Sequence, residues 1–178
     1  MTASQLPAST LPVTAVVMGV SGAGKSAVGV RLAARFGAAF IDGDDLHPPE
    51  NIAKMAAGHP LDDADRRPWL LAVGRWLREH RAEGAIAACS ALKRSYRDLL
   101  RQACPGVVFI HLAGGRDLII ERVAARQHHF MPAGLVDSQF ATLEPLGADE
   151  QGITLDVTGP VQEVAGRAAA WLTERPAG

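Results

Sequence analysis

The chain has 178 residues, of which 48% are hydrophobic, and its net charge is -1. That length suffices for one substantial core, so we expect a single domain over 13–178 after a disordered N-terminal tail at 1–12. The absence of any Lys/Arg cluster argues against nucleic acid or a membrane surface as the main partner. The two cysteines lack metal-ligand spacing, and the chain starts without signal-peptide features, which favours a cytoplasmic protein.

The first chemical motif follows the first predicted strand, Thr14 to Met18. Gly19-Val-Ser-Gly-Ala-Gly-Lys-Ser26 fits the pattern G-x-x-x-x-G-K-[S/T]. A strand that enters a glycine loop and then a helix directs backbone N–H groups and the positive helix end at one point, where a polyphosphate can lie. The pattern predicts a bound nucleoside triphosphate, with Lys25 at the β- and γ-phosphates and the Ser26 hydroxyl on Mg²⁺. The residues predicted to bind the nucleotide here are Gly19, Ser21, Gly22, Ala23, Gly24, Lys25, Ser26 and Ala27.

Acidic residues follow the second predicted strand. A helix over 25–36 ends at Gly37, and Ala39 to Ile41 form a short strand. Asp42 and Asp44 then emerge at the same sheet edge as the glycine loop. We expect Asp42 to hold Mg²⁺ directly or through water, and Asp44 to orient an attacking hydroxyl or accept its proton. An acidic turn that only caps the next segment is the alternative.

Two apolar runs, Ala85 to Cys89 and Val107 to Leu112, are typical of strands buried on both faces of a parallel sheet. A helix from residue 62 or 63 to about 80 precedes them, and a helix over 93–102 separates them. Ser90 and Lys93 therefore lie at a helix start after a strand, a position that suits an anionic or polyhydroxyl substrate.

The helix predicted from Arg116 to Arg126 carries Arg122 and Arg126 on one face, just before an irregular, His-rich stretch at 127–136. This arrangement suits a mobile lid over about 126–137, in which one arginine stacks on adenine and the other clamps the migrating phosphoryl group. His128 and His129 are interpreted as incidental or substrate-contacting, not as metal ligands. A last strand at 153–157 and a helix at 161–172 complete an α/β sandwich with a five-stranded parallel sheet, whose ligands lie at the carboxyl ends of the strands.

Several stretches together resemble the gluconate kinases of the shikimate-kinase-like branch of P-loop kinases, from Val16 onward. They are Gly19 to Ser26; Asp42-Gly43-Asp44-x-Leu46-His47-Pro48 with Asn51-Ile52-x-Lys54-Met55; Gly58 to Leu70; Cys89-Ser90-Ala91-Leu92-Lys93-x-x-Tyr96-Arg97-Asp98-x-Leu100-Arg101; and His129-Phe130-Met131-Pro132 leading to Gln139-Phe140-x-x-Leu143-Glu144. The glycine loop alone indicates only the superfamily. The second and fourth stretches are much narrower signals.

The resemblance implies a three-layer αβα P-loop kinase that phosphorylates D-gluconate at its 6-hydroxyl with ATP and Mg²⁺, and it implies a homodimer. Lys25, Asp44 and Arg126 are the implied catalytic residues, Ser26 and Asp42 the implied Mg²⁺ ligands, and Arg122 the neighbour of adenine. The implied substrate-binding residues are Asp44, His47, Arg66 or Arg67, Ser90, Lys93, Arg97 and His129. His59 and Gln127-His128 depart from the usual pattern, which bears on local charge and on the lid.

Three other classes fit less well. A GTPase usually needs an Asn-Lys-x-Asp element, whereas Asn51 is followed by Ile52. A dinucleotide-binding oxidoreductase would leave Lys25 and Ser26 unexplained. A non-catalytic regulatory protein would more plausibly have lost Lys25 or the acid pair. Within the kinases, another sugar acid or shikimate is the alternative substrate.

Overall fold

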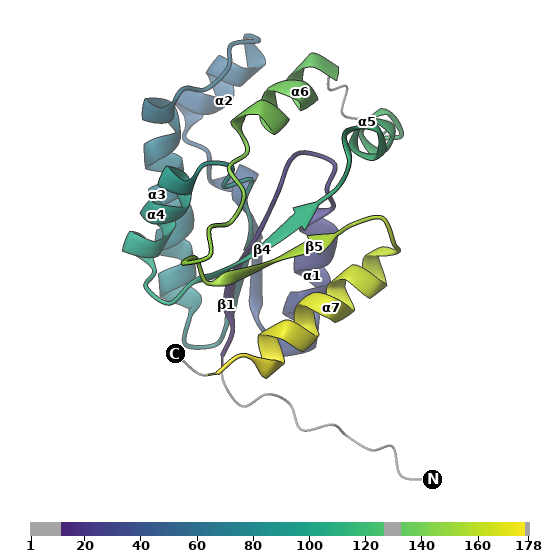
Figure 1. Ribbon diagram of the computed structural model, residues 1–178. Helices are drawn as coiled ribbons and strands as arrows, with labels where there is room; N and C mark the ends of the chain where they lie inside the picture. The colour runs from purple at the N-terminus through teal and green to yellow at the C-terminus, as the bar shows by residue number, and fades with distance from the viewer. Residues whose placement is uncertain (1–11, 127–132, 177–178) are drawn as a thin grey trace.

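The computed structural model describes residues 12–126 and 133–176. At its centre lies a sheet of five strands in the order β2-β3-β1-β4-β5 (Figure 1). Each neighbouring pair of strands is parallel, which confirms the predicted sheet. The strands are β1 Thr14–Met18, β2 Ala39–Asp42, β3 Ala85–Ala88, β4 Val108–Ala113 and β5 Gly152–Asp156.

Helices cover both faces of the sheet and give the predicted three layers. Helices α1 Lys25–Phe36, α5 Arg116–Ala124 and α7 Val161–Glu174 contribute to the core on one face, and α3 Asp63–His80 and α4 Arg94–Ala103 to the core on the other. The shorter helices α2 Pro49–Ala56 and α6 Ala133–Thr142 lie at one end of the molecule (Figure 1), and a 3₁₀ turn, η1 Gly43–Leu46, follows β2.

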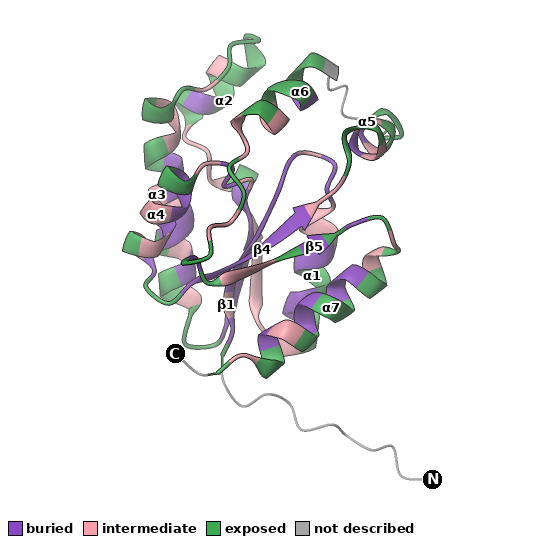
Figure 2. Ribbon diagram, in the orientation of Figure 1, coloured by how far each residue is buried: buried purple, intermediate pink, exposed green. Residues whose placement is uncertain are grey.

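Alternate residues of the central strands supply the two cores, because successive side chains of a strand point to opposite faces. Val17 and Ile110 belong to the α1/α7 core, whereas Val16 and Phe109 belong to the α3/α4 core. The central strands are buried and the outward faces of the helices are exposed (Figure 2). The sheet is thus a rigid frame for whatever lies at its ends.

The ends of the long helices follow their sequence signals. Helix α1 stops at Gly37, whose φ of 63° is left-handed. Helix α3 starts with a capping box in which the Asp62 side chain accepts from the Asp65 N–H and the Asp65 side chain accepts from the Asp62 N–H. These caps fix the helices that carry Lys25 and Arg66.

Two helices were not predicted. Helix α2 buries only Asn51, so its sequence has no apolar stripe to reveal it. Helix α6 begins at residue 133, so the expectation of an irregular stretch as far as 136 is wrong over 133–136. Within the described parts of the chain, no helix combines the length and apolarity needed to cross a membrane.

Candidate active site

The glycine loop, Gly19–Ser26, joins the carboxyl end of β1 to α1. Gly19 has a φ of 145°, and a Cβ there would lie 2.7 Å from the carbonyl oxygen of Leu112, so a side chain does not fit. The Gly19 N–H donates to the carbonyl of Ser90 at 3.2 Å. The loop therefore leaves β1 in close contact with residues that follow β3 and end β4.

Lys25 brings the charges of the loop together with those of the next strand. Its Nζ donates to the carbonyl of Val20 at 3.1 Å. Burial lowers the pKa of Lys25 and Arg126 lowers it further, whereas Asp44, Cys89 and Asp42 raise it. The charges of Asp42, Asp44 and Arg126 thus all act on Lys25, which places these four residues at one site.

The two acids at the end of β2 have different surroundings. Asp42 accepts from the Ser26 hydroxyl at 2.6 Å and from the Asp44 N–H at 3.0 Å, so its carboxylate is held in place. The side chain of Asp44 is 84% exposed. Loss of solvation on its protein side, together with the negative charge of Asp42, raises the pKa of Asp44. One acid is thus fixed beside Ser26, and the other is free to meet a ligand.

A glycine and a tryptophan hold this acidic turn against the sheet. A Cβ on Gly43 would lie 2.6 Å from the carbonyl oxygen of Ala88 in β3. The indole N–H of Trp69 in α3 donates to the carbonyl of Gly43 at 2.7 Å. Trp69 is 4% exposed, as expected of a core residue, and it also fixes the backbone between the two acids.

His47 lies behind Asp44. Its ring stacks on Trp69 with centroids 4.2 Å apart, its Nδ1 lies 3.3 Å from the amide nitrogen of Asn51, and its Nε2 lies 4.0 Å from Asp44. Burial lowers the pKa of His47, Asp44 raises it, and Arg66 lowers it. The neutral ring is therefore favoured near pH 7. Asn51, to which the sequence assigned no role, fixes that ring.

A second cluster lies at the start of α4. Residues 89–93 follow β3, and we call them the acceptor loop because the sequence predicts substrate contacts from Ser90 and Lys93. Lys93 donates to Asp63 at 3.0 Å. The Tyr96 hydroxyl also donates to Asp63, at 2.5 Å, and Arg66 donates to that hydroxyl at 3.4 Å. Lys93 and Arg66 lie 5.5 and 5.6 Å from the centre of the Tyr96 ring. The predicted cations Arg66 and Lys93 thus meet around Tyr96, which the sequence left without a role.

Arg97 requires a correction. Its side chain is fully buried, and its guanidinium donates to Glu150 and to the carbonyls of Ala91, Leu92 and Pro145. It therefore has no exposed group for a substrate, and the prediction that it binds substrate is wrong. The sequence could not show this, because Glu150 lies 53 residues away.

Helix α5 ends at Ala124, so the expectation of one helix as far as Arg126 is wrong, and Arg122 lies in the helix while Arg126 follows it. Arg122 donates to the carbonyl of Val157, after β5, at 2.5 Å. Arg126 is exposed, and its charge acts on Lys25. Residues 127–132, which are half of the predicted lid at 126–137 and include His129, lie outside the described residues.

The sequence missed one contact to the glycine loop. The Gln139 side chain of α6 accepts from the Ser21 N–H at 2.7 Å and donates to the Ser21 hydroxyl at 3.1 Å. Gln139 belongs to the last of the stretches that resemble the gluconate kinases, and this resemblance was the only sign in the sequence that Gln139 has a role. The helix that follows residues 127–132 is thereby attached to the phosphate-binding loop.

Comparison with known proteins decides the family. The sequence model of the shikimate kinase family matches residues 21–149. The gluconokinase of Gluconobacter oxydans is 51% identical, over 76% of this chain and 77% of that protein. The thermoresistant gluconokinase of Escherichia coli is 46% identical, over 84% of this chain and 87% of that protein. The chain belongs to the gluconokinase family.

Solved structures agree with this assignment. The gluconokinase from Sinorhizobium meliloti superposes on this gluconokinase-family chain with a TM-score of 0.83 and 47% identity, covering 91% of this chain and 92% of that one. An unliganded sugar kinase from Janibacter gives the same TM-score and identity, covering 90% and 94%. The resemblance drawn from the motifs is confirmed.

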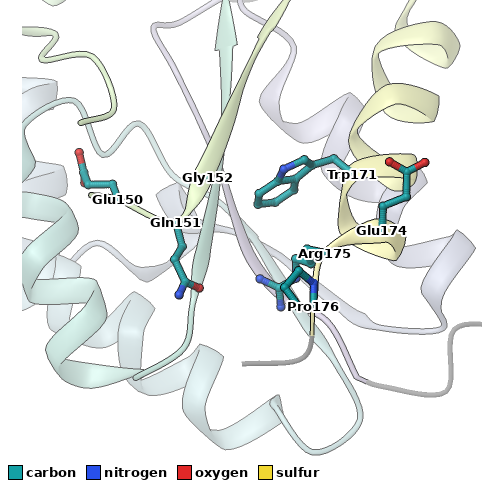
Figure 3. A pocket seen from close by; sticks show the side chains of 7 residues that line it. All are labelled: Glu150, Gln151, Gly152, Trp171, Glu174, Arg175 and Pro176. Carbon is teal, nitrogen blue, oxygen red and sulfur yellow. The ribbon is translucent and has the colours of Figure 1, made fainter. Parts of the chain in front are cut away.

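Two other features of this gluconokinase-family chain have no assigned role in the reaction. Burial raises the pKa of Cys89 to about 12, so its thiol stays protonated and is not a nucleophile near neutral pH. A hollow of about 490 Å³ lies at the opposite edge of the sheet, between the start of β5 and the end of α7 (Figure 3). Its lining residues Trp171 and Arg175 belong to neither cluster described above.

Proposed function

We propose that the chain transfers the γ-phosphoryl group of ATP to the 6-hydroxyl of D-gluconate, giving 6-phospho-D-gluconate and ADP. The observation that carries this function is the 51% and 46% identity to two gluconokinases over most of the chain. The geometry supports it, because a phosphate-binding loop, an acid pair and a cluster with Arg66 and Lys93 occur at the same sheet edge.

The loop and its cations serve the donor. Backbone N–H groups of residues 19–27 and the ammonium of Lys25 bind the phosphates, and Arg126 adds positive charge where the phosphoryl group passes. Arg122 lies near the loop after β5, where we assign the adenine. Positive charge held in place stabilises the transferring phosphoryl oxygens without reorganisation during the reaction.

The residues beside Lys25 fit a magnesium ion. The Ser26 hydroxyl and the Asp42 carboxylate are oxygen donors held 2.6 Å apart, and Mg²⁺ in kinases takes one or two such protein groups together with phosphate oxygens and waters. We assign Ser26 to direct ligation and Asp42 to direct or water-mediated ligation. When bound, Mg²⁺ neutralises charge on the β- and γ-phosphates.

Asp44 serves the acceptor. Its exposed carboxylate accepts a hydrogen bond from the 6-hydroxyl and takes its proton as the new O–P bond forms and the bond from the γ-phosphorus to ADP breaks. Arg66 and Lys93 bind the carboxylate at the other end of gluconate, and Ser90, His47 and His129 bind its hydroxyls. We also propose that residues 126–137 act as the lid, within one domain over 13–178.

We further propose a cytoplasmic homodimer. Both cysteines are free and buried, which suits a reducing compartment. Light scattering after gel filtration should give twice the mass of one chain. A monomer at micromolar concentration would contradict the dimer without touching the reaction.

An acceptor panel tests the function. Release of ADP from Mg·ATP should be measured with gluconate, other aldonates, glucose, shikimate and adenosine 5'-phosphosulfate, with Lys25→Ala as the inactive control. A site that pairs buried polar groups with substrate hydroxyls discriminates strongly, so gluconate should dominate. A flat profile, or shikimate as the best acceptor, would contradict the proposal.

A further inference from the structure

A buried ion pair joins α4 to the segment before β5. Nε and Nη2 of Arg97 donate to the two carboxylate oxygens of Glu150 at 2.7 and 2.9 Å. The side chains of Arg97 and Glu150 are 0% and 1% exposed. Figure 3 shows the Glu150 carboxylate directed away from Trp171. A bidentate pair of this kind fixes the plane and direction of the guanidinium.

The other N–H groups of Arg97 bind backbone. Nη1 donates to the carbonyls of Ala91 and Leu92 at 3.0 and 3.3 Å, and Nη2 donates to that of Pro145 at 3.3 Å. A guanidinium has five N–H groups, and all five are used here. Ala91 and Leu92 belong to the acceptor loop, so Arg97 fastens that loop to Glu150.

The acceptor loop needs such a fastening. Ala91 has a φ of 44° and is the one non-glycine residue with a positive φ in the described ranges. An L-residue with a Cβ disfavours this conformation and keeps it only where its surroundings impose it. The bond from Arg97 to the Ala91 carbonyl is one such constraint, and the bond from the Glu144 N–H to the Leu92 carbonyl, at 2.8 Å, is another.

The position of this loop matters for the reaction. Ser90 and Lys93, both assigned to the acceptor, flank Ala91 and Leu92. The Ser90 carbonyl also accepts from the Gly19 N–H of the phosphate-binding loop. A displacement of Ala91 and Leu92 therefore moves the acceptor contacts relative to the donor. A misplacement of about 1 Å can cost about 100-fold in rate.

We propose that Arg97, oriented by Glu150, is a positioning residue that holds the acceptor loop in the geometry required for phosphoryl transfer. The proposal rests on the proposed function, because the acceptor loop has this meaning only if it binds gluconate. Arg97 acts through Ser90 and Lys93 and touches no substrate.

The chain offers a matched control in Arg101. Arg101 donates at 2.9 Å to Oε1 of Glu150, the oxygen that also accepts from Nε of Arg97, and it donates to Asp98 at 2.6 Å. Within the described residues, Arg101 has no hydrogen bond to the acceptor loop. Arg97→Lys keeps a positive charge beside Glu150, yet one ammonium cannot span both Glu150 and the loop carbonyls. Arg101→Lys makes the same chemical change without touching the loop.

Steady-state kinetics should separate the two variants. Arg97→Lys should raise the KM for gluconate by about 10-fold or more and change the KM for ATP by less than about twofold, because the phosphate-binding loop keeps its own supports. Arg101→Lys should leave both constants within about twofold. The proposal would be overturned if Arg97→Lys and Arg101→Lys had the same KM for gluconate. It would also be overturned if Arg97→Lys raised the KM for ATP as much as the KM for gluconate.

A second variant covers the case in which Arg97→Lys fails to fold. Arg97→Met combined with Glu150→Met removes both charges at similar volume and leaves neither partner charged and buried alone. It should fold and still show the raised KM for gluconate, because the loop carbonyls have lost their donor. A folded double variant with a wild-type gluconate KM would overturn the positioning role.

Hydrogen exchange of a peptide covering residues 89–97 makes the result independent of the substrate. The backbone amides of this peptide should exchange faster in Arg97→Lys than in Arg101→Lys. If the wild-type chain does not phosphorylate gluconate, the proposed function fails, and exchange alone then decides the positioning claim. Equal exchange in the two variants overturns it.

Discussion

Lys25 carries positive charge into a site that already holds two acids, and burial lowers its pKa. The ammonium of Lys25 is therefore placed to bind the phosphates of a nucleoside triphosphate. We expect Lys25→Ala to lower kcat by about 100- to 1,000-fold, as loss of one fixed donor at a developing oxyanion does, with an unchanged circular dichroism spectrum. Arg31→Ala, which removes an exposed cation from the same helix, is the control. Turnover near the wild-type value in Lys25→Ala would remove the loop from the mechanism.

Asp44 and Asp45 are neighbouring acids with different assignments. Asp44→Asn should lower kcat by about 100-fold or more, because the amide cannot accept the proton of the hydroxyl, and should leave ATP affinity within about threefold. Asp45→Asn changes an exposed acid by the same single atom and should leave kcat unchanged. Titration of ATP binding beside kinetics tests this, and equal kcat values in both variants would exclude Asp44 as the base.

The raised pKa of Asp44 gives a pH dependence. The carboxylate must be ionised to accept a proton, so kcat/KM for gluconate falls as the pH falls through its pKa. Because that pKa lies above the usual value for aspartate, about 3.9, the acid limb should appear at a higher pH than for an ordinary aspartate. A pH–rate profile that stays flat down to about pH 4 on a protein that remains folded would contradict the role.

At the scale of elements, the sequence predicted what short, contiguous patterns encode. The strand-loop-helix unit around Gly19 and the acids after β2 are local signals, and both lie where expected. Helix α2 was missed because its eight residues bury only Asn51. The partner of Arg97 and the contact from Gln139 to Ser21 join residues 53 and 118 positions apart. No pattern in one sequence reveals such pairs, because they depend on how the loops fold over the sheet.

The capping box of α3 gives a prediction for one element. Asp62→Ala leaves the Asp65 N–H without its acceptor and should lower the free energy of unfolding by about 1 kcal/mol. Asp62→Asn keeps a side-chain oxygen and should cost only a few tenths of that loss. Urea denaturation of both variants measures the difference. Equal losses would show that the charge, not the cap, stabilises the helix start.

At the scale of the whole molecule, Glu150 makes stability depend on pH. Burial raises the pKa of Glu150, but hydrogen bonds from Arg97, Gly147 and Arg101 outweigh burial and lower it to about 2 from 4.5. A carboxylate with a depressed pKa stabilises the fold above the unfolded-state value, and that stability is lost as the pH falls from about 4.5 to about 2. The shift corresponds to about 3 kcal/mol.

Glu150→Gln should therefore lose less stability than the wild type between about pH 5 and pH 2, by up to about 3 kcal/mol. Urea midpoints across that range measure it, and Asp98→Asn, an exposed partner of Arg101, controls for general acid effects. Parallel acid curves for wild type and Glu150→Gln would exclude Glu150 as a source of the pH dependence.

The strand order has a consequence for how acceptor choice changes over evolution. Strand β3 lies between β1 and β2, so the acceptor loop leaves the sheet between the phosphate-binding loop and the acid pair. The two side chains that we propose to bind the far end of the acceptor are Arg66 of α3 and Lys93, the last residue before α4. Substitutions at these two positions can therefore change which acceptor the kinase selects, while the phosphate-binding loop stays unchanged.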